Sequence, residues 1–115
     1  MRNDRARLED IRDAIAEIEK RTPRECEDLE RDEMLRVWVL YHLQIIGEAC
    51  RGLSDDFRQR HAEDIWSSAI SFRNVLVHQY FGIDIEAVWQ VIARDLPELR
   101  SLVECVLGER TPRSS

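Results

Sequence analysis

The stretch AEDIWSSAISFRNVLVHQY, residues 62–80, decides the fold, because apolar residues occupy two of the three faces it would present as a helix. At about 100° per residue, one face carries only core-type side chains: Ile65, Ala69, Phe72 and Leu76. A second apolar face has an arginine among its members: Trp66, Ile70, Arg73, Val77 and Tyr80. The third face is small and polar: Ser67, Ser71, Asn74 and His78. No face is left for long solvated charges, so we expect this helix to be the central one.

Apolar residues recur at spacings of three and four on both sides of this stretch, which predicts further amphipathic helices. Before it, long helices are expected over residues 5–21 and 32–51, with a short one after the possible capping box Thr22–Glu25. After it, a helix follows Asp84, and Asp95–Glu98 indicates another helix start or a kinked continuation. No β-alternation appears, so we predict an all-α, antiparallel bundle of four to five helices.

Three residues in the connections mark where helices are expected to end or begin. Gly52 is predicted to end the helix over residues 32–51 in a left-handed conformation. Ser54 can cap a short helix that runs to about residue 60, and Gly108 follows the last helix. The spacing of these signals predicts short connections between neighbouring helices.

Composition favours one soluble helical domain. Hydrophobic residues make up 43% of the 115 positions and charged residues 35%, with only 4 Gly and 3 Pro. We expect a single domain over residues 1–108 and a disordered polar tail over residues 109–115. No run approaches the roughly 18 apolar residues of a membrane span, and the charged start of the chain is unlike a secretion signal. A cytoplasmic protein without membrane contact is therefore expected.

The net charge of −6 disfavours long-range attraction to nucleic acid, because nonspecific binding depends on neutralising phosphates. A nucleic-acid site would have to be local, and Arg51, Arg58 and Arg60 make one connection locally basic. The cysteines have the spacing of neither a disulfide framework nor a metal site, and we expect them to be small buried residues: Cys26, Cys50 and Cys105. No tight cluster of Asp, Glu and His predicts a metal, and no cofactor is expected.

Arg73, His78 and Tyr80 are the residues of the opening stretch that can do chemistry. Each also has a structural interpretation: Arg73 could form a salt bridge with Glu48, His78 could be a satisfied structural histidine, and Tyr80 could be packing. Together they fit cleavage of a phosphodiester by a 2'-hydroxyl, which needs a proton donor or acceptor near neutral pH and a fixed cation. Histidine and arginine supply both functions without metal.

Arg73 and His78 do not face one point within a single helix, because five residues correspond to a rotation of about 140°. Either the helix distorts before Gly82 or two copies meet across a two-fold axis. We favour a symmetric homodimer with a composite site at its interface. That interface would bury the second apolar face of the helix: Trp66, Ile70 and Val77.

The arrangement Arg73, four residues, His78, one residue, Tyr80 resembles the RxxxxHxY motif of the HEPN superfamily, and specifically of the HepT-like ribonuclease toxins. The surrounding sequence is similar to that family in the expected order, from about Leu8 to Leu107. The matching segments are Ile45–Ala49, Arg73–Asn74, His78–Asp84, Val88–Trp89 and Asp95–Leu99.

The resemblance implies a HEPN-like all-helical homodimer that cleaves RNA without metal as the toxin of a type VII-like toxin–antitoxin pair. Arg73 would stabilise the phosphate and His78 would handle the proton, with Asn74 and Glu48 in supporting roles. The family's usual partner is a minimal nucleotidyltransferase antitoxin that transfers AMP from ATP to the motif tyrosine, here Tyr80. The added phosphate would repel RNA from the cleft.

Two other interpretations stay open. In one, the chain is a noncatalytic helical dimer that acts as the binding or regulatory partner of a nucleotidyltransferase, with Arg73 and His78 as a structural or nucleotide-binding patch. In the other, it is a structural dimer without a ligand, which leaves an arginine on an apolar face unexplained. Neither the RNA that is cut nor the cleavage sequence follows from the residues.

Overall fold

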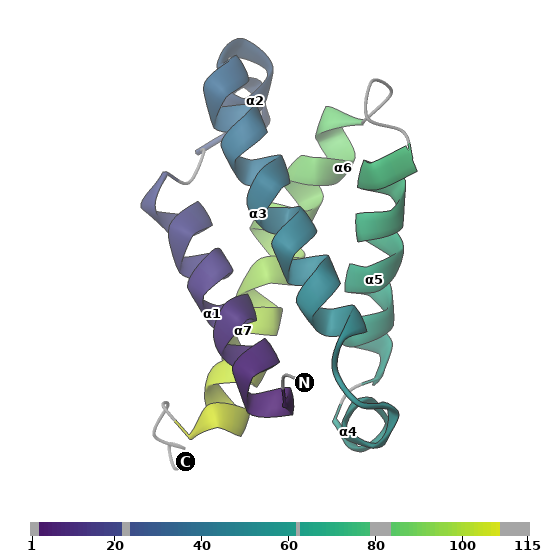
Figure 1. Cartoon of the computed structure of the whole chain (residues 1–115). Helices are drawn as coiled ribbons and strands as arrows, with labels where there is room; N and C mark the ends of the chain where they lie inside the picture. Colours follow the sequence, from purple (N-terminus) through teal and green to yellow (C-terminus); the bar gives the residue numbers. More distant parts are fainter. Residues whose placement is uncertain (1–2, 22–23, 62, 79–83, 109–115) are drawn as a thin grey trace.

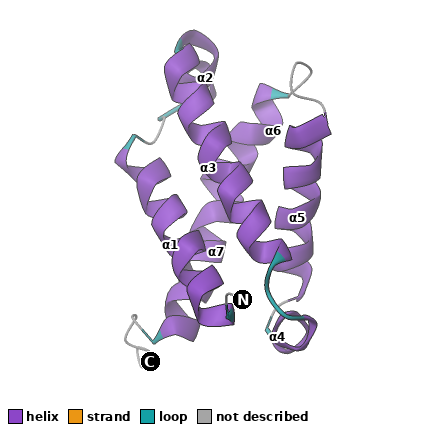
Figure 2. Cartoon of the chain, viewed as in Figure 1, coloured by secondary structure: helices purple, strands orange, loops and turns teal. Residues whose placement is uncertain are grey.

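The computed structural model of the chain describes residues 3–21, 24–61, 63–78 and 84–108, with the side chains of Glu63 and residues 72–78 outside this description. Every regular element in these ranges is helical (Figure 2), which confirms the all-α class. The elements are α1 (Asp4–Lys20), α2 (Cys26–Arg31), α3 (Glu33–Arg51), α4 (Asp55–Arg60), α5 (Glu63–His78), α6 (Ile85–Gln90), the π-helix η2 (Val91–Asp95) and α7 (Leu96–Leu107).

The long helices run up and down in turn (Figure 1), as predicted for an antiparallel bundle. The α6–η2–α7 run forms one rod that returns to the end where α1 begins. Helix α3 packs against both α1 and α5, and α7 packs against α1. The central helix is therefore α3, and the prediction that residues 62–80 would form it is wrong, because α5 packs mainly along α3 and makes only a smaller contact with the short α4.

The core is built from the apolar faces that the sequence indicates. All five residues of the α1 stripe are buried: Leu8, Ile11, Ala14, Ile15 and Ile18. On α3, His42 is buried with its Nδ1 2.8 Å from the carbonyl oxygen of Trp38, so this histidine is a satisfied structural group. The indole of Trp38 donates to the carbonyl oxygen of Glu17 at 3.0 Å and joins α3 to α1.

The start of α2 differs from the prediction. The helix begins at Cys26, and the reciprocal capping pair is Glu25 with Asp28; Thr22 of the predicted capping box lies outside the described residues. The Asp28 carboxylate accepts from the backbone N–H groups of Arg24 at 2.8 Å and Glu25 at 3.1 Å. These two hydrogen bonds lower the pKa of Asp28.

Gly52 follows α3 but is not left-handed, since its φ is −81° and its ψ is −7°. The predicted conformation is wrong. The glycine instead permits a close approach, because a Cβ there would lie 2.5 Å from Cζ of Arg7. Gly108 after α7 does adopt the left-handed conformation expected of a helix end, with φ 76°.

The segment Asp95–Glu98 continues the helix and does not cap a new one. Asp95 has helical dihedral angles, φ −80° and ψ −40°, and its side chain makes no capping hydrogen bond. The helix widens into η2 before this point, and Val88, Ile92 and Leu96 are all buried. Two successive spacings of four would rotate an α-helix by about 80° away from its starting face. The wider π turn reduces this rotation.

The cysteines only partly follow the prediction: Cys50 is buried, Cys26 is half-buried and Cys105 is exposed. Burial raises the pKa of the Cys50 thiol to about 12. The tail over residues 109–115 lies outside the described residues. No helix in the described ranges is long and apolar enough to span a membrane.

Candidate functional site

Helix α5 contains the Arg73, Asn74 and His78 positions, and its backbone is α-helical through His78. The side chains of these three residues, and all of Tyr80, lie outside the described residues. Five residues of α-helix separate Arg73 from His78 by about 140° of rotation and about 7.5 Å of rise. Because the helix is regular as far as His78, a distortion before that residue does not bring the two positions together. The separation within one copy therefore stands.

Trp66 lies on the same helical face as Arg73, two turns earlier, and it is 0% exposed. Its indole N–H donates to the carbonyl oxygen of His61, and its ring lies 5.9 Å from that of Phe57. Helix α4 thus covers this part of α5 from within the same chain. The prediction that Trp66 lies at a dimer interface is wrong.

The rest of the predicted interface is less completely covered. Ile70 is half-buried against the core cluster, and the side chain of Val77 lies outside the described residues. Ser67 and Ser71, on the small polar face, are exposed. The accessible face of α5 is therefore the one that continues in register to Asn74 and His78.

Glu48 is exposed on α3 and lines a hollow of about 260 Å³ between α1 and α3. Tyr41, 59% exposed, and Gln44 line the same hollow. Arg7 reaches it from α1, with a buried Nε that has no hydrogen-bond partner. The hollow therefore offers both hydrogen-bond donors and acceptors to a small polar group. Its lining includes charges of both signs, from Glu48 and Arg7.

The arginines expected to contact RNA are largely committed to nearby carboxylates. Nη2 of Arg58 lies 2.6 Å from Oδ1 of Asp55, and Nη2 of Arg60 lies 3.0 Å from Oδ2 of Asp56. Arg51 is exposed at the last residue of α3. The aspartates of the first turn of α4 thus offset the positive charge that the sequence suggested, and a phosphate would have to compete with them.

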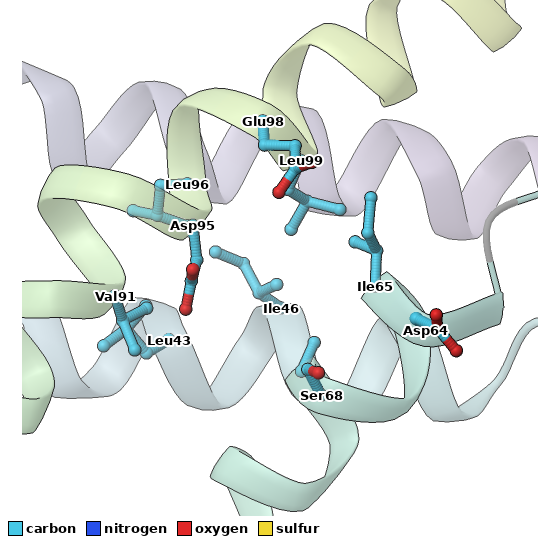
Figure 3. A pocket seen from close by; sticks show the side chains of 11 residues that line it. Leu43, Ile46, Asp64, Ile65, Ser68, Val91, Asp95, Leu96, Glu98 and Leu99 are labelled. Atoms are coloured by element: carbon cyan, nitrogen blue, oxygen red, sulfur yellow. The ribbon is translucent and has the colours of Figure 1, made fainter.

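A cavity that the sequence did not predict lies beside α5, with a volume of about 310 Å³ (Figure 3). Residues of α3, α5, η2 and α7 line it, and Asp64, Asp95 and Glu98 are the acidic ones. Among the described residues, no group of three or more His, Cys, Asp or Glu could hold a metal ion.

Comparison with known proteins places the chain beside ribonucleases. The sequence model of the family described as "Ribonuclease HepT-like" matches residues 11–106. A protein of Thermococcus cleftensis named "Probable ribonuclease HepT" is 38% identical over 98 residues, which cover 84% of this chain and 89% of that protein. A putative RNase of Methanocaldococcus jannaschii is 39% identical over 75 residues, 65% of this chain and 69% of the relative. No solved structure matches.

Proposed function

Because the chain belongs to the HepT-like ribonuclease family, we propose that it is a metal-independent endoribonuclease toxin that acts in the cytoplasm. The observation that carries the proposal is the complete Arg73, His78 and Tyr80 set within a family match that spans residues 11–106. The two candidate catalytic positions both belong to the helix α5, whose backbone is regular between them.

In the proposed reaction, the 2'-oxygen of a ribose forms a bond to the adjacent phosphorus and the bond from phosphorus to the 5'-oxygen breaks. His78 takes the proton of the 2'-hydroxyl or delivers one to the leaving oxygen, since histidine titrates near neutrality. Arg73 stabilises the negative charge on the phosphate oxygens, because its guanidinium stays charged and matches phosphate geometry. Asn74 orients the phosphate or the histidine, and Glu48 on the adjacent α3 supports the arginine.

The proposed site is composite: Arg73 and His78 of both copies line a shared cleft, and Arg73 of one copy acts with His78 of the other. The rotation of about 140° between the two positions in a regular helix supports this arrangement. With Trp66 committed to its own core, the copies are proposed to meet along the accessible face of α5 that carries Ser67 and Ser71. Arg51, Arg58 and Arg60 are proposed RNA contacts at the end of the bundle where α4 lies.

The proposed partner is a minimal nucleotidyltransferase antitoxin that transfers AMP to Tyr80. ATP is the substrate of that partner and not a cofactor of this chain. An AMP group on Tyr80, two residues after His78, places a phosphate where the RNA phosphate must bind. Like-charge repulsion then accounts for neutralisation.

RNA cleavage in the presence of a chelator tests the activity. The wild-type protein should cut cellular RNA, and Arg73→Ala and His78→Ala should each lower the rate by roughly 100- to 10,000-fold. Arg94→Ala is the matched control, because Arg94 is an exposed arginine of η2 whose guanidinium donates to the side chain of Gln90 at 3.3 Å. An inactive wild type, or variants that cut as fast as wild type, would contradict the catalytic assignment.

A noncatalytic helical dimer that serves as the partner of a nucleotidyltransferase is the second candidate. The net charge of −6 and the ion pairs of Arg58 and Arg60 favour it, because they leave little unpaired positive charge on α4 for RNA. Mass spectrometry after incubation with the partner and ATP would detect AMP on Tyr80 in either case. The cleavage assay separates the two functions.

A further inference from the structure

One side of the bundle is not closed within the described chain. Helix α3 packs against α1 and α5, and α7 packs against α1, but α5 and the α6–η2–α7 rod make few close backbone contacts. The cavity of about 310 Å³ lies along this open side. Its walls are apolar side chains of three helices: Leu43, Ile46, Ile65, Ala69, Leu96 and Leu99.

The rim of the cavity is acidic. Asp64 of α5, Asp95 of η2 and Glu98 of α7 are all exposed, and Figure 3 shows Asp64 on the wall opposite the other two. The structure records no ion pair for these three carboxylates among the described residues, whereas carboxylates on other faces, such as Glu19 with Arg100 at 2.8 Å, are paired. The open side thus combines an apolar interior with uncompensated negative charge.

The π-helix shapes one wall of the cavity. Val91 and Asp95, the first and last residues of η2, both line it. π turns are rare and occur frequently at functional sites. Asp95 has no capping hydrogen bond at the start of α7, so no local role accounts for its carboxylate.

We propose that this cavity binds a basic amphipathic segment of a partner protein, which inserts one large apolar side chain and places Lys or Arg residues on the rim. The volume is at the lower end of the roughly 300–1,000 Å³ typical of ligand pockets, which suits an anchor side chain better than a large cofactor. The three carboxylates select a cationic partner by charge complementarity. Anchors of this kind in a groove supply most of the affinity of helical segments.

A second copy of this chain is a poor occupant of the same groove. A two-fold contact places the same patch on both sides, so Asp64, Asp95 and Glu98 would face their own counterparts. Like charges brought together across an interface are destabilising. The inference is independent of the proposed nuclease, because it uses none of residues 73–80.

Selection of a display library of short random peptides on the purified chain tests the proposal. Enriched peptides should carry Leu, Phe or Trp flanked by Lys or Arg, and their affinity, measured by fluorescence anisotropy, should fall as salt rises. Asp64→Asn combined with Asp95→Asn and Glu98→Gln should weaken binding roughly ten-fold. Ala69→Phe, which fills the cavity, should abolish it.

A matched variant carries Glu27→Gln, Glu30→Gln and Glu33→Gln, which change the net charge by the same three units on exposed residues of α2 and the start of α3. It should bind like wild type, and melting curves establish that each variant is folded. No enrichment, enrichment of neutral or acidic peptides, or equal binding by the rim variant would overturn the proposal. A changed oligomeric state of the rim variant in light scattering would assign the groove to a second copy and would overturn it as well.

Discussion

The carboxylate of Asp4 holds Ser54 with both oxygens: Oδ1 accepts from the backbone N–H at 2.8 Å and Oδ2 accepts from the hydroxyl at 2.8 Å. The Ser54 hydroxyl in turn accepts from the backbone N–H of Phe57 at 3.1 Å and caps α4. Ser54, which follows the end of α3, is therefore bonded both to Asp4 at the start of α1 and to α4. Phe57 of α4 packs against Trp66. The position of α4 against the bundle depends on this short chain of hydrogen bonds.

Asp4→Asn should lower the free energy of unfolding by about 1 kcal/mol, because one of the two hydrogen bonds is lost. Ser54→Ala should cost about 1–2 kcal/mol, since it also removes the cap of α4. Urea denaturation measures both changes. Asp13→Asn, an exposed residue of α1 that pairs with neighbouring Arg12, should change stability by less than about 0.5 kcal/mol. Equal effects of Asp4→Asn and Asp13→Asn would contradict the account.

Trp66→Ala should lower the free energy of unfolding by about 3–5 kcal/mol, because a fully buried indole leaves a cavity beside Phe57. Trp66→Phe should cost less, since it keeps most of the packing and loses the hydrogen bond to His61. The loss should be the same at low and high protein concentration. If the loss of stability depended on protein concentration, Trp66 would instead stabilise the contact between two copies.

The composite site makes a distinct prediction for mixtures of inactive variants. Arg73→Ala and His78→Ala copies, unfolded together and refolded, should recover roughly a quarter of wild-type activity, because half of random dimers contain one intact site out of two. Mixing Arg73→Ala with itself in the same protocol is the control. Two inactive variants that stay inactive after mixing, at concentrations where dimers are seen by light scattering, would place both residues in one copy.

The cysteines should differ sharply in reactivity. At pH 8 the buried Cys50, whose pKa is raised to about 12, should be almost inert to iodoacetamide in the native protein, whereas the exposed Cys105 should be alkylated quickly. Mass spectrometry of digested protein follows each site. In denaturant the two should react at similar rates. Equal native rates would show that Cys50 is accessible through frequent opening of α3.

The helices of this chain could be predicted because their signals are local. The apolar stripe of α1 and the capping residues Ser54 and Asp84 act within one or two helical turns. The errors arise where the local conformation depends on a part of the chain that is distant in sequence. The sequence predicts a left-handed Gly52, whereas the structure places the guanidinium of Arg7, which is far away in sequence, close against this glycine.

The candidate site was predictable to the same extent. The motif residues could be identified from the sequence, and two apolar faces could be assigned to α5. Helical period alone does not distinguish a face covered by the same chain from one covered by a partner, because both bury apolar surface. Phe57 of α4 settles the question for Trp66. The acidic cavity could not be predicted from the sequence, because it depends on how far apart α5 and the α6–η2–α7 rod lie in the folded bundle.

The π-helix η2 has a consequence for chain length. A π turn holds one residue more than an α turn, so Val91–Asp95 acts as a one-residue insertion within an otherwise continuous helix. Without one residue such as the exposed Ala93, spacings of four and three would still place Val88, Ile92 and Leu96 on a common side of an α-helix. The hydrophobic core does not need the additional residue. A deletion there would change the turn that contributes Val91 and Asp95 to the cavity while keeping the core spacing, so the shape of this surface and the fold of the bundle can change separately.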